Sequence, residues 1–256
     1  MIVRAARAEW VKLSTVRATR WTLAASIAFG LFIVVLVALV TRNSESTTED
    51  GIHLALAPFT GLGGIPGIAV IFSAVIGILS VTSEIRFNTI RTTFLAVSHR
   101  PVALVAKTVV VGVVCAVAFF LAEVVAMAVF LILGGGGAGF SPFGDGASVY
   151  ITLPIAAALA STLGLAVGTA VRNAAGAITL LLAYMMVVES VIVTVPQTRG
   201  AAPYLPMTNF ENFLGTATAT SAIDFPWPPV GSLVYLIVVI GLLWVGSVAL
   251  ITRRDA

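Results

Sequence analysis

Long apolar stretches, separated by short polar segments, dominate this chain of 256 residues. Six stretches are long enough to cross a bilayer as helices, because a hydrocarbon core about 30 Å thick needs about 20 residues at 1.5 Å per residue. They cover residues 21–41, 61–82, 102–133, 149–171, 177–195 and 230–251. Their length and their lack of period-two alternation argue against membrane strands, so all six are predicted to be helices.

Two of these stretches depart from a simple perpendicular span. Pro58 and Pro66 stand near the start of residues 61–82, which predicts a kinked or partly unwound outer end. Residues 102–133 are too long for a perpendicular helix, so we expect this helix to tilt or to extend beyond the hydrocarbon core.

The composition assigns the chain to the membrane. Hydrophobic residues make up 59% and charged residues 10% of the sequence, whereas a soluble domain usually carries about 25% charged residues. The predicted fold class is therefore an all-α, polytopic membrane protein, one transmembrane domain over residues 1–256. The only cysteine, Cys115, lies in an apolar stretch, which excludes an intrachain disulfide bond.

The positive charges predict the orientation. If the amino terminus is cytoplasmic, twelve of the fourteen Lys and Arg residues flank the spans on the inside, and only Arg42 and Arg199 lie outside. Six spans then return the carboxyl terminus to the cytoplasm. The net charge of +3 is thus an orientation signal and not a nucleic-acid surface. We expect a bacterial plasma membrane protein.

The segment before the first span, residues 1–20, has an amphipathic pattern. Val3, Trp10 and Leu13 fall roughly on one helical side, and most basic residues lie elsewhere. This pattern predicts a helix along the inner interface, with a frayed basic flank as the alternative. A signal peptide is the weaker interpretation of residues 21–41, because the stretch is long and lacks a small-residue cleavage site.

The sequence offers no enzymatic centre of a familiar kind. His53 and His99 fall on opposite sides of the predicted membrane, so the usual zinc ligands cannot meet. Neither Lys12 nor Lys107 follows a glycine, so the chain contains no P-loop. The GxSxG motif is also absent. We expect a chain that is not itself an enzyme and binds no cofactor.

Two acidic residues lie within predicted spans. Glu123 is well along residues 102–133, and Glu189 is two-thirds along residues 177–195. A charge at such depth costs about 2.5–3.5 kcal/mol, so each side chain is expected to face protein or water. Both are candidates for a substrate pathway. The alternative is a protonated or hydrogen-bonded carboxyl that serves only packing.

The fourth predicted span carries small residues at every fourth position. These are Ala160, Gly164 and Gly168, and they permit a neighbouring helix to approach closely. We interpret them as a packing face within the bundle.

The polar cytoplasmic segment at residues 83–101 joins the second and third predicted spans. Its apolar residues, among them Ile90 and Phe94, predict a short amphipathic helix that can press on a peripheral protein. A plain connector is the alternative.

This segment resembles the coupling loop of the ABC-2 type permeases, the membrane subunits of ATP-binding-cassette exporters. In that family the loop carries an acidic residue, a basic residue, a Gly-Thr pair and a terminal Arg or Pro. The matching residues here are Glu84, Arg86, Thr89, Arg91, Arg100 and Pro101, with Asn88 in place of the glycine. The six spans, the amino-terminal segment and the long outer segment at residues 196–229 are also similar.

The resemblance implies a coupling helix that docks on an ATPase. The residues assigned to it are Glu84, Arg86, Thr89, Ile90, Arg91, Phe94 and Arg100. The partners implied are a cytoplasmic ABC ATPase, which holds ATP and Mg²⁺, and a second permease, identical or related, within membrane lipid. The implied cargo is a drug, a peptide antibiotic or a lipid-like compound.

Two other function classes stay open at this stage. One is a proton-coupled secondary transporter that uses Glu123 and Glu189 as a relay. The other is a membrane scaffold without transport or an intramembrane enzyme, for which the sequence offers no nucleophilic centre.

Overall fold

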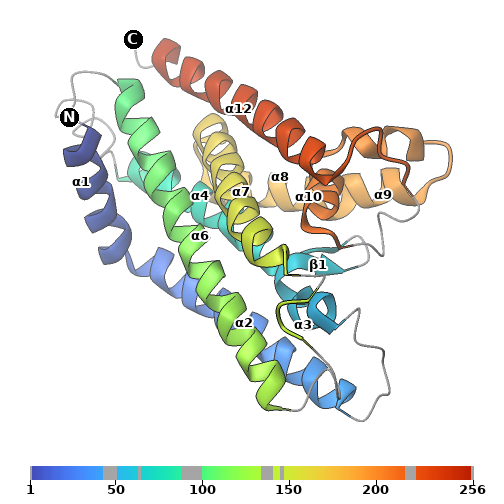
Figure 1. Ribbon diagram of the computed structural model, residues 1–256. Coiled ribbons are helices and arrows are strands. Elements are labelled where there is room, and N and C mark those ends of the chain that lie inside the picture. The colour runs from blue at the N-terminus through green and yellow to red at the C-terminus, as the bar shows by residue number, and fades with distance from the viewer. Residues whose placement is uncertain are drawn as a thin grey trace.

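The computed structural model describes residues 2–42, 51–62, 65–87, 100–133, 141–144, 147–216 and 223–254. These residues form a helical bundle with one pair of two-residue strands (Figure 1). Six helical runs are long and apolar enough to cross a membrane. They are α2 (Arg17–Thr41), α4 (Ile68–Arg86), α6 (Arg100–Ile132), α7 (Val149–Val171), the continuous run Ala174–Thr194, and α12 (Pro229–Arg254). The prediction of a helical chain with six helices long and apolar enough to cross a membrane is confirmed for the described residues.

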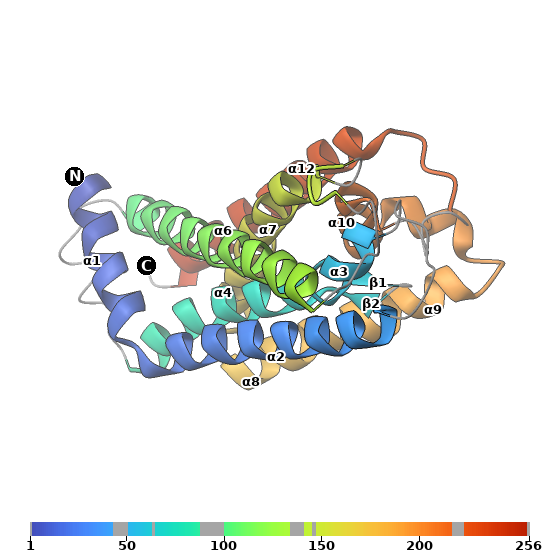
Figure 2. The same cartoon turned by 60° about the horizontal axis from the view of Figure 1, so that its bottom comes forward.

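The amino-terminal residues form a separate helix, α1 (Ile2–Thr15). Val16 takes an extended conformation between α1 and α2, so the two helices meet at an angle (Figure 2). Both chain ends lie at one end of the bundle, which we call the termini end, and the helices of the segment before α12 lie at the opposite end (Figure 1).

The second span begins later in the structure than the apolar pattern predicts. Helix α3 (Gly51–Thr60) is followed by a tight antiparallel pair, β1 (Gly61–Leu62) and β2 (Ile65–Pro66), before α4 starts at Ile68. Gly61 has a φ of 104°, a conformation that favours glycine. Residues 61–62 and 65–67 therefore lie outside the helices, and this strand pair is the unwound outer end expected from the two prolines.

Helices α4 and α7 form the centre of the bundle through glycine contacts. A methyl group on Gly164 would overlap the carbonyl oxygen of Ala74, and one on Gly77 would overlap that of Ser161. A methyl group on Gly168 would lie 2.9 Å from the Val81 Cγ1 atom. The structure thus places Gly164 and Gly168 against the backbone of α4, with Ala160 fully buried on the same helix.

The fifth span is interrupted by a wider helical turn. It consists of α8 (Ala174–Ala183), the π-helix η2 (Tyr184–Val188) and α9 (Glu189–Thr194). Single π-turns inside α-helices often occur at functional sites. The outer segment that follows contains a 3₁₀ helix, η3 (Arg199–Tyr204), and α10 (Pro206–Leu214), which packs against α12 and α7.

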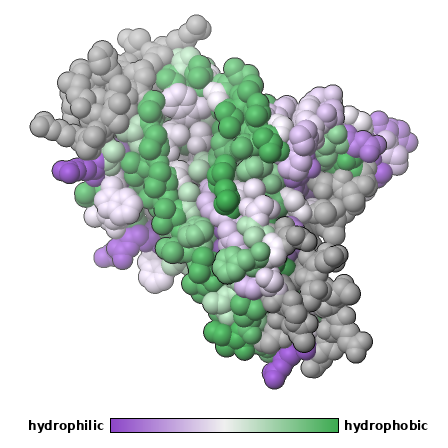
Figure 3. Space-filling view, viewed as in Figure 1, coloured by the Kyte–Doolittle hydropathy of each residue, from purple (hydrophilic) through white to green (hydrophobic). Residues whose placement is uncertain are grey.

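Apolar side chains cover much of the outer surface of the spans. Figure 3 shows bands of hydrophobic residues running along the visible helices. Helix α2, the run Ala174–Thr194 and α12 bury the smallest share of their residues within the chain. Their exposed faces are therefore the ones available to lipid or to another subunit.

Candidate functional site

A cluster of two acids and two bases lies at the termini end. Glu9 and Lys12 come from α1, Glu84 from the last turn of α4, and Lys107 from the second turn of α6. The Lys107 Nζ atom lies 2.5 Å from Glu9 Oε2 and 2.9 Å from Glu84 Oε1. The Lys12 Nζ atom lies 2.7 Å from Glu9 Oε1 and 2.8 Å from Glu84 Oε1. We call these four residues the ion cluster.

The ion cluster is largely shielded from solvent. Glu9, Glu84 and Lys107 are buried, and the Lys12 side chain is 38% exposed. Burial by itself lowers the pKa of Lys12, but hydrogen bonds to Glu84 and Glu9 and the charges of both acids outweigh it and raise the pKa above the ordinary value. The formal charges of the four residues sum to zero, so the cluster balances its own charge.

The position of the ion cluster links three helices. The last turn of α4 and the first turns of α6 flank residues 88–99, and α1 packs against α6. The cluster joins α4 and α6 to α1 by ion pairs of 2.8 and 2.5 Å and joins them to each other by an ion pair of 2.9 Å. The cluster therefore connects the two helix ends that flank residues 88–99 with α1.

The residues assigned to a coupling helix are only partly described. Glu84 points into the ion cluster and is 7% exposed. Arg86 is exposed, with its Cζ atom 5.8 Å from the centroid of the Phe87 ring. Arg100 begins α6, and nothing is described of its side chain. The other four lie outside the described residues: Thr89, Ile90, Arg91 and Phe94.

Glu9 and Lys107 were not singled out by the sequence analysis. Glu9 stands three residues before Lys12 in α1, the spacing at which two side chains of one helix meet. Lys107 lies inside the apolar stretch at residues 102–133, where an unpaired charge is costly. This cost predicts that Lys107 has a partner, but the sequence does not show which residue the partner is.

Glu189 binds the start of α10. Its Oε2 atom accepts hydrogen bonds from the backbone amides of Met207, at 2.9 Å, and Thr208, at 3.4 Å. These amides belong to the first turn of a helix, where a carboxylate also interacts favourably with the helix dipole. The Glu189 Oε1 atom is buried and has no hydrogen-bond partner among the described residues.

Glu123 is in a different situation. It is completely buried in α6, and neither carboxyl oxygen has a hydrogen-bond partner within the described part of the chain. No hydrogen bond joins it to Glu189 among the described residues. The structure thus gives Glu189 a contact with the outer segment and gives Glu123 none.

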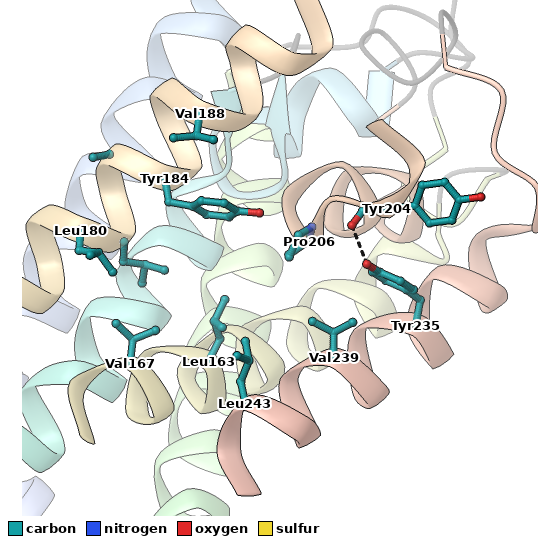
Figure 4. A pocket seen from close by; sticks show the side chains of 12 residues that line it. Leu163, Val167, Leu180, Tyr184, Val188, Tyr204, Pro206, Tyr235, Val239 and Leu243 are labelled. Carbon is teal, nitrogen blue, oxygen red and sulfur yellow. Dashed lines mark hydrogen bonds between the residues drawn. The ribbon is translucent and has the colours of Figure 1, made fainter. Parts of the chain in front are cut away.

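An apolar cleft of about 680 Å³ separates α7, η2 and α12 (Figure 4). Leu163 and Val167 line it from α7, and Val239 and Leu243 line it from α12. A second hollow, of about 450 Å³, shares Val167 and Leu243 and continues towards the termini end. Both volumes lie in the range typical of pockets that bind small molecules.

The outer end of the cleft is aromatic. Tyr184 extends its hydroxyl across the cleft towards Pro206, and the Tyr235 hydroxyl donates a 2.6 Å hydrogen bond to the Tyr204 carbonyl oxygen (Figure 4). Glu189 follows η2 directly, and its backbone amide donates a hydrogen bond to the Tyr184 carbonyl oxygen. Sequence reasoning missed this cleft because its leucines and valines look the same as any others in a span.

Within the described ranges, no group of three or more His, Cys, Asp or Glu side chains is placed to hold a metal ion. No known protein-family model matches the chain, and no curated protein matches it. Six apolar helices of spanning length define the class, a multi-pass membrane protein.

Proposed function

We propose that the chain is the permease subunit of an ABC-type exporter in a bacterial plasma membrane, driven by a separate ATPase. The observation that carries the proposal is the ion cluster. It ties to α1 both Glu84, at the start of the segment at residues 83–101, and Lys107, in the helix that follows the segment. The six spans and the missing P-loop fit a membrane subunit whose energy comes from a partner.

In this proposal the two chain termini and residues 83–101 face the cytoplasm, and α1 lies along the inner interface. ATP binding and hydrolysis on the partner move residues 83–101. Glu84 then serves as the internal tie that passes the movement to α1 and α6, because its carboxylate is bonded to Lys12 and Lys107. Arg86, which is exposed, is the described residue best placed to contact the ATPase.

The transporter also includes a second permease, identical or related. The least buried spans, α2, Ala174–Thr194 and α12, offer the faces for it. The cargo is a small amphipathic compound, because the described hollows are lined almost entirely by apolar side chains.

The test is co-purification with an ABC ATPase after charge reversal of Arg86 and Arg91. Glu84 stays unchanged, because its reversal would break the ion cluster and confuse docking with folding. We expect Arg86→Glu with Arg91→Glu to abolish co-purification. Arg199→Glu, an exposed residue in the outer segment, is the matched control and is expected to have no effect. Undiminished co-purification of the double variant would contradict the docking site.

One observation favours the proton-coupled alternative, namely that the Glu123 carboxyl has no partner among the described residues. Transport into vesicles that contain only this chain separates the two functions. Uptake driven by a pH gradient and abolished by Glu123→Gln supports the proton relay. Transport that requires the ATPase and survives Glu123→Gln supports the exporter.

A further inference from the structure

The aromatic end of the cleft is built as a rigid unit. The Trp227 ring stacks on the Tyr235 ring, with centroids 5.5 Å apart and planes 19° apart, and meets the Tyr204 ring edge-on at 5.8 Å. The Trp227 Nε1 atom donates hydrogen bonds to Asn209 Oδ1, at 3.2 Å, and to Ser232 Oγ, at 3.0 Å. The rings are thus held before any ligand arrives, which lowers the entropy cost of binding.

Two acidic residues lie at this end. Glu189 and Glu211 are both buried beside the cleft-forming helices, and the Glu189 Oε1 atom has no hydrogen-bond partner among the described residues. The Glu189 backbone amide donates a hydrogen bond to the carbonyl oxygen of Tyr184, which lines the cleft, so Glu189 stands one π-turn beyond a cleft residue. None of the twelve side chains that line the cleft is basic. An anionic ligand would therefore meet no positively charged side chain among the lining residues. A cation would be attracted by the aromatic rings and by the acidic side chains.

Aromatic ring faces and a carboxylate together recognise an organic cation. Ring faces carry partial negative charge and attract ammonium-type groups, most strongly where water is excluded. A carboxylate behind the rings adds Coulomb attraction that is stronger in apolar surroundings than in water. The remaining walls, from Leu163 and Val167 to Val239 and Leu243, suit a hydrophobic body.

We propose that the cleft between α7, η2 and α12 binds a hydrophobic organic cation, with its positive group at the Tyr184–Tyr235 end and its apolar body between α7 and α12. This inference deepens the proposed export function by naming the charge class of the cargo. It concerns binding by the chain itself, so it is tested without any ATPase.

The experiment measures binding of two ions of the same shape and opposite charge, tetraphenylphosphonium and tetraphenylborate. The full chain is held in nanodiscs of phosphatidylcholine, and empty nanodiscs correct for uptake by lipid. We expect tetraphenylphosphonium to bind about tenfold or more tightly than tetraphenylborate. Equal affinity for the two ions, or tighter binding of the anion, overturns the proposal.

Three variants locate the site. Glu189→Gln keeps an oxygen for the Met207 amide but removes the charge, and Tyr235→Leu removes a ring; each is expected to weaken cation binding about fivefold or more. Val239→Trp fills the cleft and is expected to abolish binding. Tyr150→Leu, at a tyrosine of α7 that does not line the cleft, is the matched control for Tyr235→Leu and is expected to bind as the parent chain does. Binding that survives Val239→Trp and Glu189→Gln in folded protein refutes the site.

The outcomes distinguish this inference from the export function. If the cation binds and no ATPase partner is found, the binding site stands and the exporter proposal fails. If an ATPase couples to the chain but the cation shows no selectivity, the exporter proposal stands and the cationic cargo is excluded.

Discussion

Lys107 and Glu9 are 98 residues apart in the chain, yet the Nζ atom of one lies 2.5 Å from the Oε2 atom of the other, and both are buried. The pair holds α1, the helix that precedes the first span in the chain, against α6. Removing one partner of a buried ion pair is costly because it leaves the other charge without compensation.

The first prediction concerns this pair. Lys107→Met is expected to destabilise the chain by about 3–5 kcal/mol and to release α1, because Glu9 and Glu84 lose a shared counter-charge. Thermal unfolding and limited proteolysis of α1 measure the effect. Arg86→Met, at an exposed position two residues from Glu84, is the control and is expected to stay within about 0.5 kcal/mol. Equal stability of the two variants would contradict the role given to the cluster.

The second prediction concerns the glycine contact between α4 and α7. Gly164→Ala is expected to lower stability by about 1–3 kcal/mol, because the added methyl group overlaps the Ala74 carbonyl oxygen. Gly241→Ala, in α12, has open space around the same position and is the matched control. We expect it to be neutral or slightly stabilising, since alanine favours a helix. A fluorescence-based unfolding assay in detergent compares the two.

The third prediction concerns the start of α10. Glu189→Leu is expected to cost about 1–3 kcal/mol, because the Met207 and Thr208 amides lose their acceptor. Glu189→Gln keeps an acceptor oxygen and is expected to lose less. Hydrogen exchange of Pro206–Leu214 measures the difference. The capping role is wrong if the two variants exchange at the same rate.

The fourth prediction is a pH dependence in the outer segment. Burial raises the pKa of Glu211 to about 7 from an ordinary value of 4.5. Between these pH values the folded segment holds a proton that the unfolded segment has released, so its stability falls as the pH rises from about 4.5 through about 7. The protection of α10 amides, measured relative to their intrinsic exchange rate at each pH, is expected to be lower at pH 8 than at pH 5.5. Glu211→Gln is expected to remove this difference.

The fifth prediction concerns orientation. Cys115 is the only cysteine and is buried, so Cys115→Ser provides a background without thiols. In that background, Arg86→Cys is expected to react with a membrane-impermeant maleimide only after the cells are permeabilised. Ser148→Cys, just before α7, is expected to react in intact cells. The reverse pattern would invert the proposed topology.

The spans were predictable because their signal is local. Twenty consecutive apolar residues predict a membrane helix whatever they contact, and each of the six predicted stretches overlaps a helix of spanning length in the structure. The small residues Ala160, Gly164 and Gly168 were also visible, since their spacing of four places them on one helix face. The start of the second span was misplaced, because the apolar residues of β1 and β2 have the same hydropathy as a helix.

Local sequence patterns could not predict the ion cluster or the cleft. Glu9, Glu84 and Lys107 come from three helices, and nothing in the spacing of their charges shows that they meet. The cleft depends on how α7 and α12 diverge around η2, and a π-turn leaves no mark in the hydropathy. Glu189 was visible as a costly charge, but its bond to the Met207 amide depends on how the outer segment folds back.

Lys12 and Lys107 are the only lysines in the sequence, and both belong to the ion cluster. Every other fixed positive side chain is therefore an arginine, which does not react with amine-directed reagents. Amine-directed acylation therefore has two side-chain targets, Lys12 and Lys107. Lys107 is buried and cannot be reached by the reagent while α1 packs against α6. On most proteins, amine labelling is hard to interpret because there are many lysines. Here, the extent of Lys107 labelling would report directly whether α1 is packed against α6.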